Sequence, residues 1–142
     1  MGMVRKLKWP LLVIIVVLIG YLLLKQYQTD LNRELNTQIT QAEALGAAFG
    51  LEHDQLACLN QSLVNIKGCS AFSCGVVHGR FFKACLSQAQ QNAAFCEAVP
   101  AYTEKKDRAT KDWLRDVCFD YPETNICNQL MRQRQQLCGS NS

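Results

Sequence analysis

The longest hydrophobic stretch of the chain is a nearly continuous apolar run from Trp9 to Leu24. At ~1.5 Å per residue, a helix that continues through Tyr27 approaches the ~30 Å thickness of a bilayer core. Aromatic side chains near both ends of the run suit the membrane interface. The pattern therefore predicts that residues 9–27 form a single transmembrane helix inserted in a lipid bilayer.

Basic residues flank this run unequally. Arg5, Lys6 and Lys8 precede it, and only Lys25 follows directly. By the positive-inside rule, residues 1–8 are cytoplasmic and the rest of the chain lies outside. The alternative is a cleaved signal peptide, but the run lacks a small-residue cleavage site at its end, which favours an uncleaved signal anchor.

A polar segment with a narrow apolar stripe follows the anchor. Leu31, Leu35 and Ile39 are spaced four residues apart, which predicts a helical stalk or linker over residues 28–50. A stripe this narrow must pack on its own domain, on a second copy or on another subunit, so these three residues are candidate partner contacts. The small residues from Gly46 to Gly50 interrupt the pattern and predict a domain boundary there.

Residues 51–142 show helical spacing and no sustained alternation of apolar and polar positions, so they predict an all-α domain without a sheet. Cap and stop residues predict where its helices begin and end. The expected signals are Asp54 or His53 and Gly68 for the first helix, Ser70 or Ser73 for the second, Asn92 for a short segment, Thr103 or Asp107 for the third long helix, and Thr124 for the last.

All eight cysteines lie in this domain, and the first four read C-x10-C-x4-C-x10-C. Two cysteines eleven residues apart on one helix share a face but lie ~16 Å apart, whereas a disulfide needs Cα atoms within roughly 7 Å. The symmetric spacing therefore predicts a helical hairpin stapled by Cys58–Cys85 and Cys69–Cys74.

The last four cysteines leave two arrangements open. Pairing Cys118 with Cys127 across the Tyr121-Pro122 turn leaves Cys96 with Cys138, and this is the set that we predict. The alternative set is Cys96–Cys127 with Cys118–Cys138.

The layout of residues 58–85 resembles the twin-cysteine hairpins of the coiled-coil-helix-coiled-coil-helix family. That family uses C-x9-C pairs where this chain has C-x10-C twice. The resemblance implies a disulfide-stapled helical hairpin and no particular function.

An even set of cysteines outside the membrane indicates an oxidising compartment. We expect the bacterial inner membrane with the cysteine-rich domain in the periplasm; the secretory pathway and the mitochondrial intermembrane space are the alternatives. The formal net charge of +3 includes the three cytoplasmic basic residues before the anchor, so the outer part is near neutral. No concentrated basic stripe is present, and we expect no nucleic-acid binding.

The sequence carries few groups for chemistry. Cys74 and His78 share a helix face at i, i+4 with Cys69 nearby, which makes a weak candidate metal site. Because every cysteine has a disulfide partner available, we expect no metal and no cofactor. The chain has only two histidines, and neither Gly-x-Ser-x-Gly nor His-Glu-x-x-His occurs, so we expect no catalytic residues and no enzyme.

Aromatic residues supply further candidate contacts. Phe81 and Phe82 point about 100° apart on a helix, so we place Phe81 in the core and take Phe82, together with Tyr121, as candidate partner-binding residues. The predicted function is an interaction protein that serves as an accessory or assembly subunit of an envelope complex. The alternatives are a metal- or redox-handling protein using Cys69, Cys74 and His78, and an envelope inhibitor or ligand-binding module.

Overall fold

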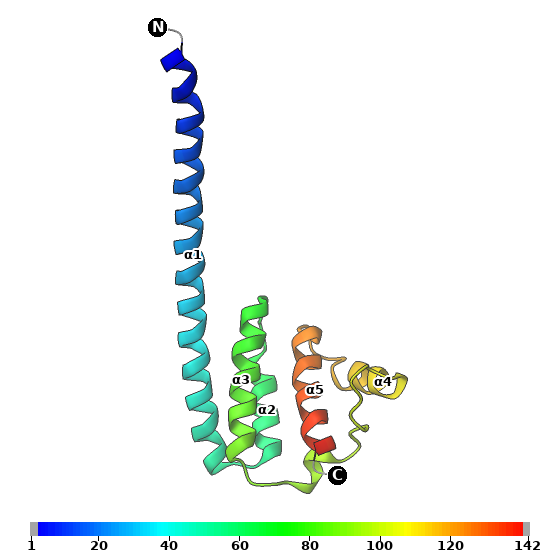
Figure 1. The fold of residues 1–142 in the computed structure, drawn as a ribbon. Helices are drawn as coiled ribbons and strands as arrows, with labels where there is room; N and C mark the ends of the chain where they lie inside the picture. The colour runs from blue at the N-terminus through cyan, green and yellow to red at the C-terminus, as the bar shows by residue number, and fades with distance from the viewer. Residues whose placement is uncertain (1–2, 141–142) are drawn as a thin grey trace. The chain divides into compact units, whose positions relative to one another are not determined.

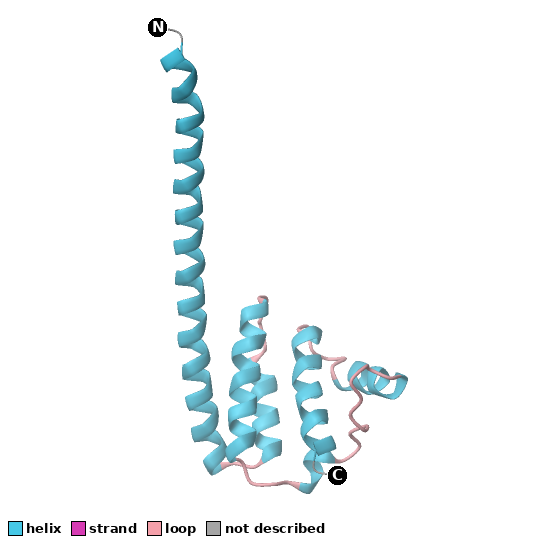
Figure 2. Ribbon diagram, viewed as in Figure 1, coloured by secondary structure: helices cyan, strands magenta, loops and turns pink. Residues whose placement is uncertain are grey.

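The computed structural model describes the backbone of residues 3–140 and the side chains of residues 9–140. Within that range the protein is all-helical with no strand, which confirms the predicted fold class (Figures 1 and 2). The chain divides into two compact units between Thr37 and Gln38, and each is described by itself. Of the predicted stalk, residues 28–37 thus belong to the first unit and residues 38–50 to the second.

The first unit is the N-terminal part of α1, Met3–Glu52. Its apolar side chains are exposed throughout the run that begins at Trp9, and among the described residues α1 is the one helix long and apolar enough to cross a membrane. Such a helix near the N-terminus indicates a membrane anchor or a signal sequence. The side chains of residues 1–8, on which the predicted cytoplasmic segment depends, lie outside the described residues.

The second unit adds α2 (Gln55–Asn65), α3 (Phe72–Gln88), the 3-10 turn η1 (Ala93–Cys96), α4 (Arg108–Val117) and α5 (Thr124–Ser140). Asp54 and Asp107 cap α2 and α4 as predicted, because their carboxylates accept hydrogen bonds from Ala57 N and Thr110 N, each at 2.8 Å. The predicted serine cap of α3 is wrong: its N-cap is Ala71, which has no side-chain hydrogen bond.

The predicted interruption at Gly46–Gly50 is also wrong, because α1 continues to Glu52. These glycines serve close packing instead. A Cβ atom at Gly46 would overlap the carbonyl oxygen of Phe81, and one at Gly50 would overlap that of Cys85. Gly46 meets Phe81 and Gly50 meets Cys85, four residues further along each helix. The last turns of α1 therefore lie alongside α3 and run in the same direction. Glycine here permits an approach that any side chain would prevent.

Helix α3 is buried on two faces, and this corrects the assignment of Phe82. Phe81 faces α1, with its ring centroid 6.2 Å from that of Phe49. Phe82 is completely buried, and its ring centroid lies 6.5 Å from that of Phe95. The prediction treated α3 as having one buried face. Because neighbours cover it on both sides, Phe82 is a core residue and cannot contact a partner.

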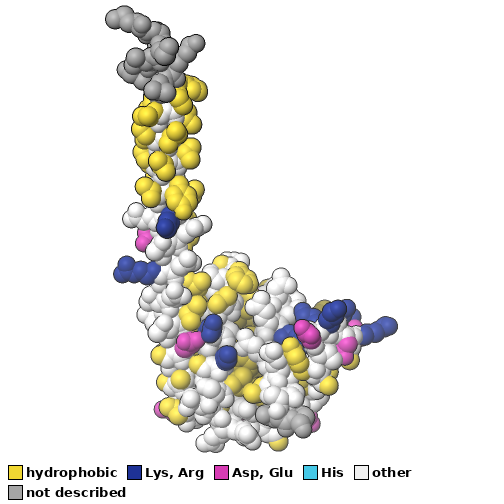
Figure 3. Space-filling view, in the orientation of Figure 1, with side chains coloured by type: hydrophobic (Ala, Val, Ile, Leu, Met, Phe, Trp, Pro, Cys, Tyr) yellow, Lys and Arg dark blue, Asp and Glu magenta, His cyan; other side chains and the backbone are white. Residues whose placement is uncertain are grey.

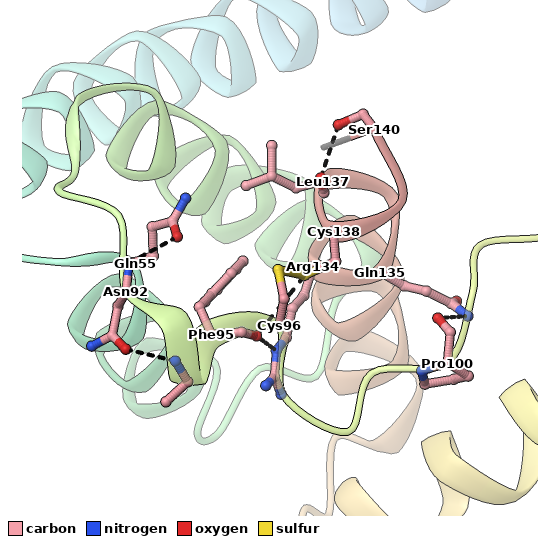
Figure 4. Close-up of a disulfide and its surroundings, with 11 residues drawn as sticks. Gln55, Asn92, Phe95, Cys96, Pro100, Arg134, Gln135, Leu137, Cys138 and Ser140 are labelled. Atoms are coloured by element: carbon pink, nitrogen blue, oxygen red, sulfur yellow. Dashed lines mark hydrogen bonds between the residues drawn. A yellow bond between two sulfur atoms is a disulfide. The ribbon is translucent and has the colours of Figure 1, made fainter. Parts of the chain in front are cut away.

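Four disulfides hold the second unit together: Cys58–Cys85, Cys69–Cys74, Cys96–Cys138 and Cys118–Cys127. The first two are the pairs that helix geometry indicates from the sequence, and of the two arrangements left open for the last four cysteines the structure has the one that we predicted. The Cys58–Cys85 and Cys118–Cys127 bonds are completely buried in the core. Cys96–Cys138 joins η1 to the end of α5 (Figure 4).

A buried polar side chain on α5 holds the extended segment before α4. Gln135 is completely buried, and its Nε2 donates to Pro100 O at 3.1 Å (Figure 4). The same amide group donates to Ala101 O at 3.0 Å and Thr110 Oγ1 at 3.0 Å. Its Oε1 accepts from Arg132. These bonds give hydrogen-bond donors to backbone carbonyl groups that do not belong to a helix or a sheet.

Gln135→Leu should therefore destabilise the domain by about 1–3 kcal/mol, because it leaves the buried Thr110 Oγ1 and the carbonyl groups of Pro100 and Ala101 without their donor. Chemical denaturation of the full chain in detergent measures this loss. Gln129→Leu, at an exposed position of the same helix, is the control and should change the free energy of unfolding by less than about 0.5 kcal/mol. Equal stabilities of the two variants would contradict the role of Gln135.

Candidate functional site

The predicted partner contacts differ in accessibility. Leu31, in the first unit, is 52% exposed, and Leu35 is half-buried. Ile39 belongs to the second unit and is half-buried there. Tyr121 is half-buried and packs against the core. Leu31 is therefore the most available of these residues, and Tyr121 presents only part of its side chain.

A groove of about 810 Å³ lies between α3 and α5 in the second unit. Gly75 and Gly79 lie on its α3 side. A Cβ at Gly75 would lie 3.2 Å from Ile126 Cγ1, and one at Gly79 would lie 3.0 Å from Gln133 Nε2. The two helices approach closely at these glycines, and the missing side chains leave the α3 wall flat.

The groove combines apolar surface with positive charge. Val76, Leu86 and Leu137 contribute apolar side chains, and Arg80 and Lys83 contribute two cations. Among the described residues that line the groove, none is acidic. Figure 3 shows basic side chains over α3 with apolar side chains beside them.

The α5 wall is polar and carries Gln129, Gln133 and Gln136. Gln133 Oε1 is buried and has no hydrogen-bond partner among the described residues. Outside the groove, Arg80 forms an ion pair of 3.4 Å with Glu43. Both of those side chains are about half exposed, so the pair is weak and leaves the arginine available to a second carboxylate. The groove is thus suited to a segment that has apolar and acidic side chains.

Two exposed aromatic residues are not among the predicted partner contacts. Phe72 is 77% exposed at the start of α3, and Phe119 is 81% exposed just after α4. Phe119 lines a smaller pocket of about 320 Å³ that also includes Lys106, Lys111 and Arg115. Each phenylalanine lies at or beyond a helix end, where periodicity no longer says which way a side chain points, so no signal in the sequence identifies them.

The structure brings Cys69, Cys74 and His78 together as the sequence suggested. One ligand atom of each lies within 4.8 Å of those of the other two, and all three side chains are half-buried. Burial lowers the pKa of His78 below its ordinary value, which favours the neutral imidazole. The other histidine, His53, does not join this cluster; its Nδ1 lies 2.9 Å from Phe49 O, and its ring stacks on the phenyl ring.

No protein-family model, no curated protein and no solved structure matches this chain.

Proposed function

We propose that this protein is a membrane-anchored interaction protein, an accessory or assembly subunit that holds a partner of an envelope complex through the groove between α3 and α5. The observation that carries the proposal is the composition of this groove. Two cations and three apolar side chains, with no acidic residue among the described residues that line it, favour a partner segment that carries apolar and acidic side chains.

The groove has the dimensions of a peptide-binding surface. Its α3 wall runs from Gly75 to Ser87, which corresponds to ~18 Å or about three helical turns. An amphipathic helix lying in such a groove is a common mode of recognition. The disulfides keep the walls in place before binding, so the partner does not have to order them.

The apolar part of α1 supports a location at a membrane, and the disulfides support an oxidising side. In the proposal, residues 9–27 span a bacterial inner membrane with the N-terminus in the cytoplasm, and the cysteine-rich unit lies in the periplasm. Leu31, Leu35 and Ile39 provide a second contact, either with the same partner or with another copy of the chain.

Charge reversal in the groove tests the proposal. The full chain is purified in mild detergent, and co-purifying proteins are quantified by mass spectrometry. In Arg80→Glu/Lys83→Glu we expect the recovery of the partner to fall at least about tenfold, because like charges then face its acidic side chains. The matched control is Lys105→Glu/Arg108→Glu, the same change of charge at exposed positions before and in α4.

A partner that is retained by the control variant and lost from the groove variant supports the proposal. Equal recovery with both variants refutes the groove as the binding surface. A chain that purifies alone under gentle conditions refutes the subunit function itself.

The alternative of a freely acting inhibitor or ligand-binding module makes a different prediction. The cysteine-rich second unit should then keep its binding activity without the anchor. Because α1 packs on α3 from Ala42 to Gly50, the deletion must end before Gln38. Removing residues 1–37 should abolish function if the protein is an anchored subunit and preserve it if the protein is a free inhibitor.

A further inference from the structure

The cluster of Cys69, Cys74 and His78 has the ligand types and nearly the spacing of a metal site. In a tetrahedral zinc site with bonds of about 2.0–2.3 Å, ligand atoms lie roughly 3.3–3.8 Å apart. The sulfurs and the imidazole nitrogen already lie within 4.8 Å of one another. The disulfide itself is what prevents coordination, because it occupies both sulfurs.

This disulfide differs from the other three. It closes the shortest loop, with a sequence separation of 5 against 9, 27 and 42. A short loop restricts the unfolded chain least, so opening it costs the least stability. Both of its cysteines are half-buried, and in this it is similar to the accessible Cys96–Cys138 bond, whereas Cys58–Cys85 and Cys118–Cys127 are completely buried.

Other bonds hold the two cysteines in place. Cys69 N donates to Ile66 O at 3.0 Å, and Cys74 N donates to Ala71 O at 3.1 Å. Gly68 N donates to Glu123 Oε1 at 2.6 Å, which fixes the turn to the segment that leads into α5. Because Cys58–Cys85 also still joins α2 to α3, opening the Cys69–Cys74 bond leaves the ligands on a prearranged frame.

We propose that Cys69, Cys74 and His78 form a Zn²⁺ site that is blocked while the Cys69–Cys74 disulfide is intact and assembled when a dithiol reductant opens it. The reductant supplies two electrons and two protons, the S–S bond breaks into two thiols, and the reductant becomes a disulfide. Binding of Zn²⁺ then releases both thiol protons and joins two thiolates and one neutral imidazole to the metal. Three protein ligands leave a fourth position open to water or to a partner side chain.

The test uses the full chain in detergent, with Co²⁺ as a spectroscopic probe for Zn²⁺. The protein is partly reduced with an immobilised phosphine, which is then removed, and alkylation with peptide mapping identifies the free thiols. We expect Cys69 and Cys74 to be labelled while Cys58 and Cys127 remain protected. One equivalent of Co²⁺ should then produce thiolate charge-transfer and tetrahedral d–d absorption, and Zn²⁺ should displace it.

Variants distinguish this site from other thiols. His78→Ala should lower the Co²⁺ affinity at least about tenfold, and His53→Ala, which changes the other histidine, should not. Cys69→Ser/Cys74→Ser keeps the accessible Cys96–Cys138 pair and should show no Co²⁺ absorption after the same reduction. Circular dichroism establishes that each variant is folded.

The proposal is overturned if Cys69 and Cys74 become free and bind no Co²⁺. It is equally overturned if His78→Ala binds Co²⁺ as tightly as the original chain, or if their disulfide resists reduction until the domain unfolds. None of these results depends on a protein partner, so they leave the proposed binding groove unaffected.

Discussion

Gly46→Leu should release the last turns of α1 from α3 and lower the free energy of unfolding by about 3 kcal/mol or more. A Cβ atom at this position would overlap the carbonyl oxygen of Phe81 and lie 3.0 Å from the carbonyl carbon. Both atoms are backbone, so no change of rotamer relieves the overlap and the helices must separate. Separation exposes the contact between Phe49 and Phe81.

Hydrogen exchange over residues 38–52 and chemical denaturation of the full chain in detergent measure this effect. Ala48→Leu is the matched control, because it adds a leucine at an exposed position of the same helix. It should change stability by less than about 0.5 kcal/mol. If Gly46→Leu is as stable as Ala48→Leu and equally protected from exchange, close packing at Gly46 is not what holds α1 on α3.

The features that sequence reasoning predicted well depend on local geometry. The caps at Asp54, Asn92 and Asp107 follow from short side chains that bond to the next turn of backbone. The pairing of the first four cysteines follows from the rise of a helix, which separates Cys58 from Cys69 and places Cys58 near Cys85 once the chain turns back. The proximity of Cys74 and His78 is likewise fixed by one turn of α3.

The features that it missed depend on which helices become neighbours. When α1 is considered alone, Gly46 and Gly50 indicate a break in the helix. Once α3 is known to lie beside them, the same glycines indicate close packing of the two helices. The burial of Phe82 depends on a second neighbour that covers the other side of α3. Gln135 has the character of a surface residue in the sequence, and only the chain around Pro100 makes it a core residue.

The groove between α3 and α5 is also a feature that depends on which helices become neighbours. Arg80 and Lys83 lie three residues apart on α3, which is consistent with any solvated helix face. They line the groove between α3 and α5 only because α5 lies beside them and contributes Leu137 and the glutamines. No periodic pattern within α3 indicates that α5 lies beside it, so the candidate site could not be derived before the fold was known.

Removing the Cys58–Cys85 disulfide should also have a large effect on stability. Cys58→Ala/Cys85→Ala should destabilise the domain by about 3.6 kcal/mol through loop entropy alone. The bond closes a sequence separation of 27, and both cysteines are completely buried. The loss of two buried sulfur atoms adds a cavity term to this value. Denaturation under non-reducing conditions measures the total.

Cys69→Ala/Cys74→Ala is the comparison, because it removes a disulfide that joins the same two-helix unit with a separation of only 5. Chain entropy predicts a loss of about 2 kcal/mol for that pair. The larger effect at Cys58–Cys85 also has a packing cause, since Cys85 lies where α3 meets Gly50 of α1. Equal losses in the two variants would mean that Cys58–Cys85 does not secure α3 between α1 and α2.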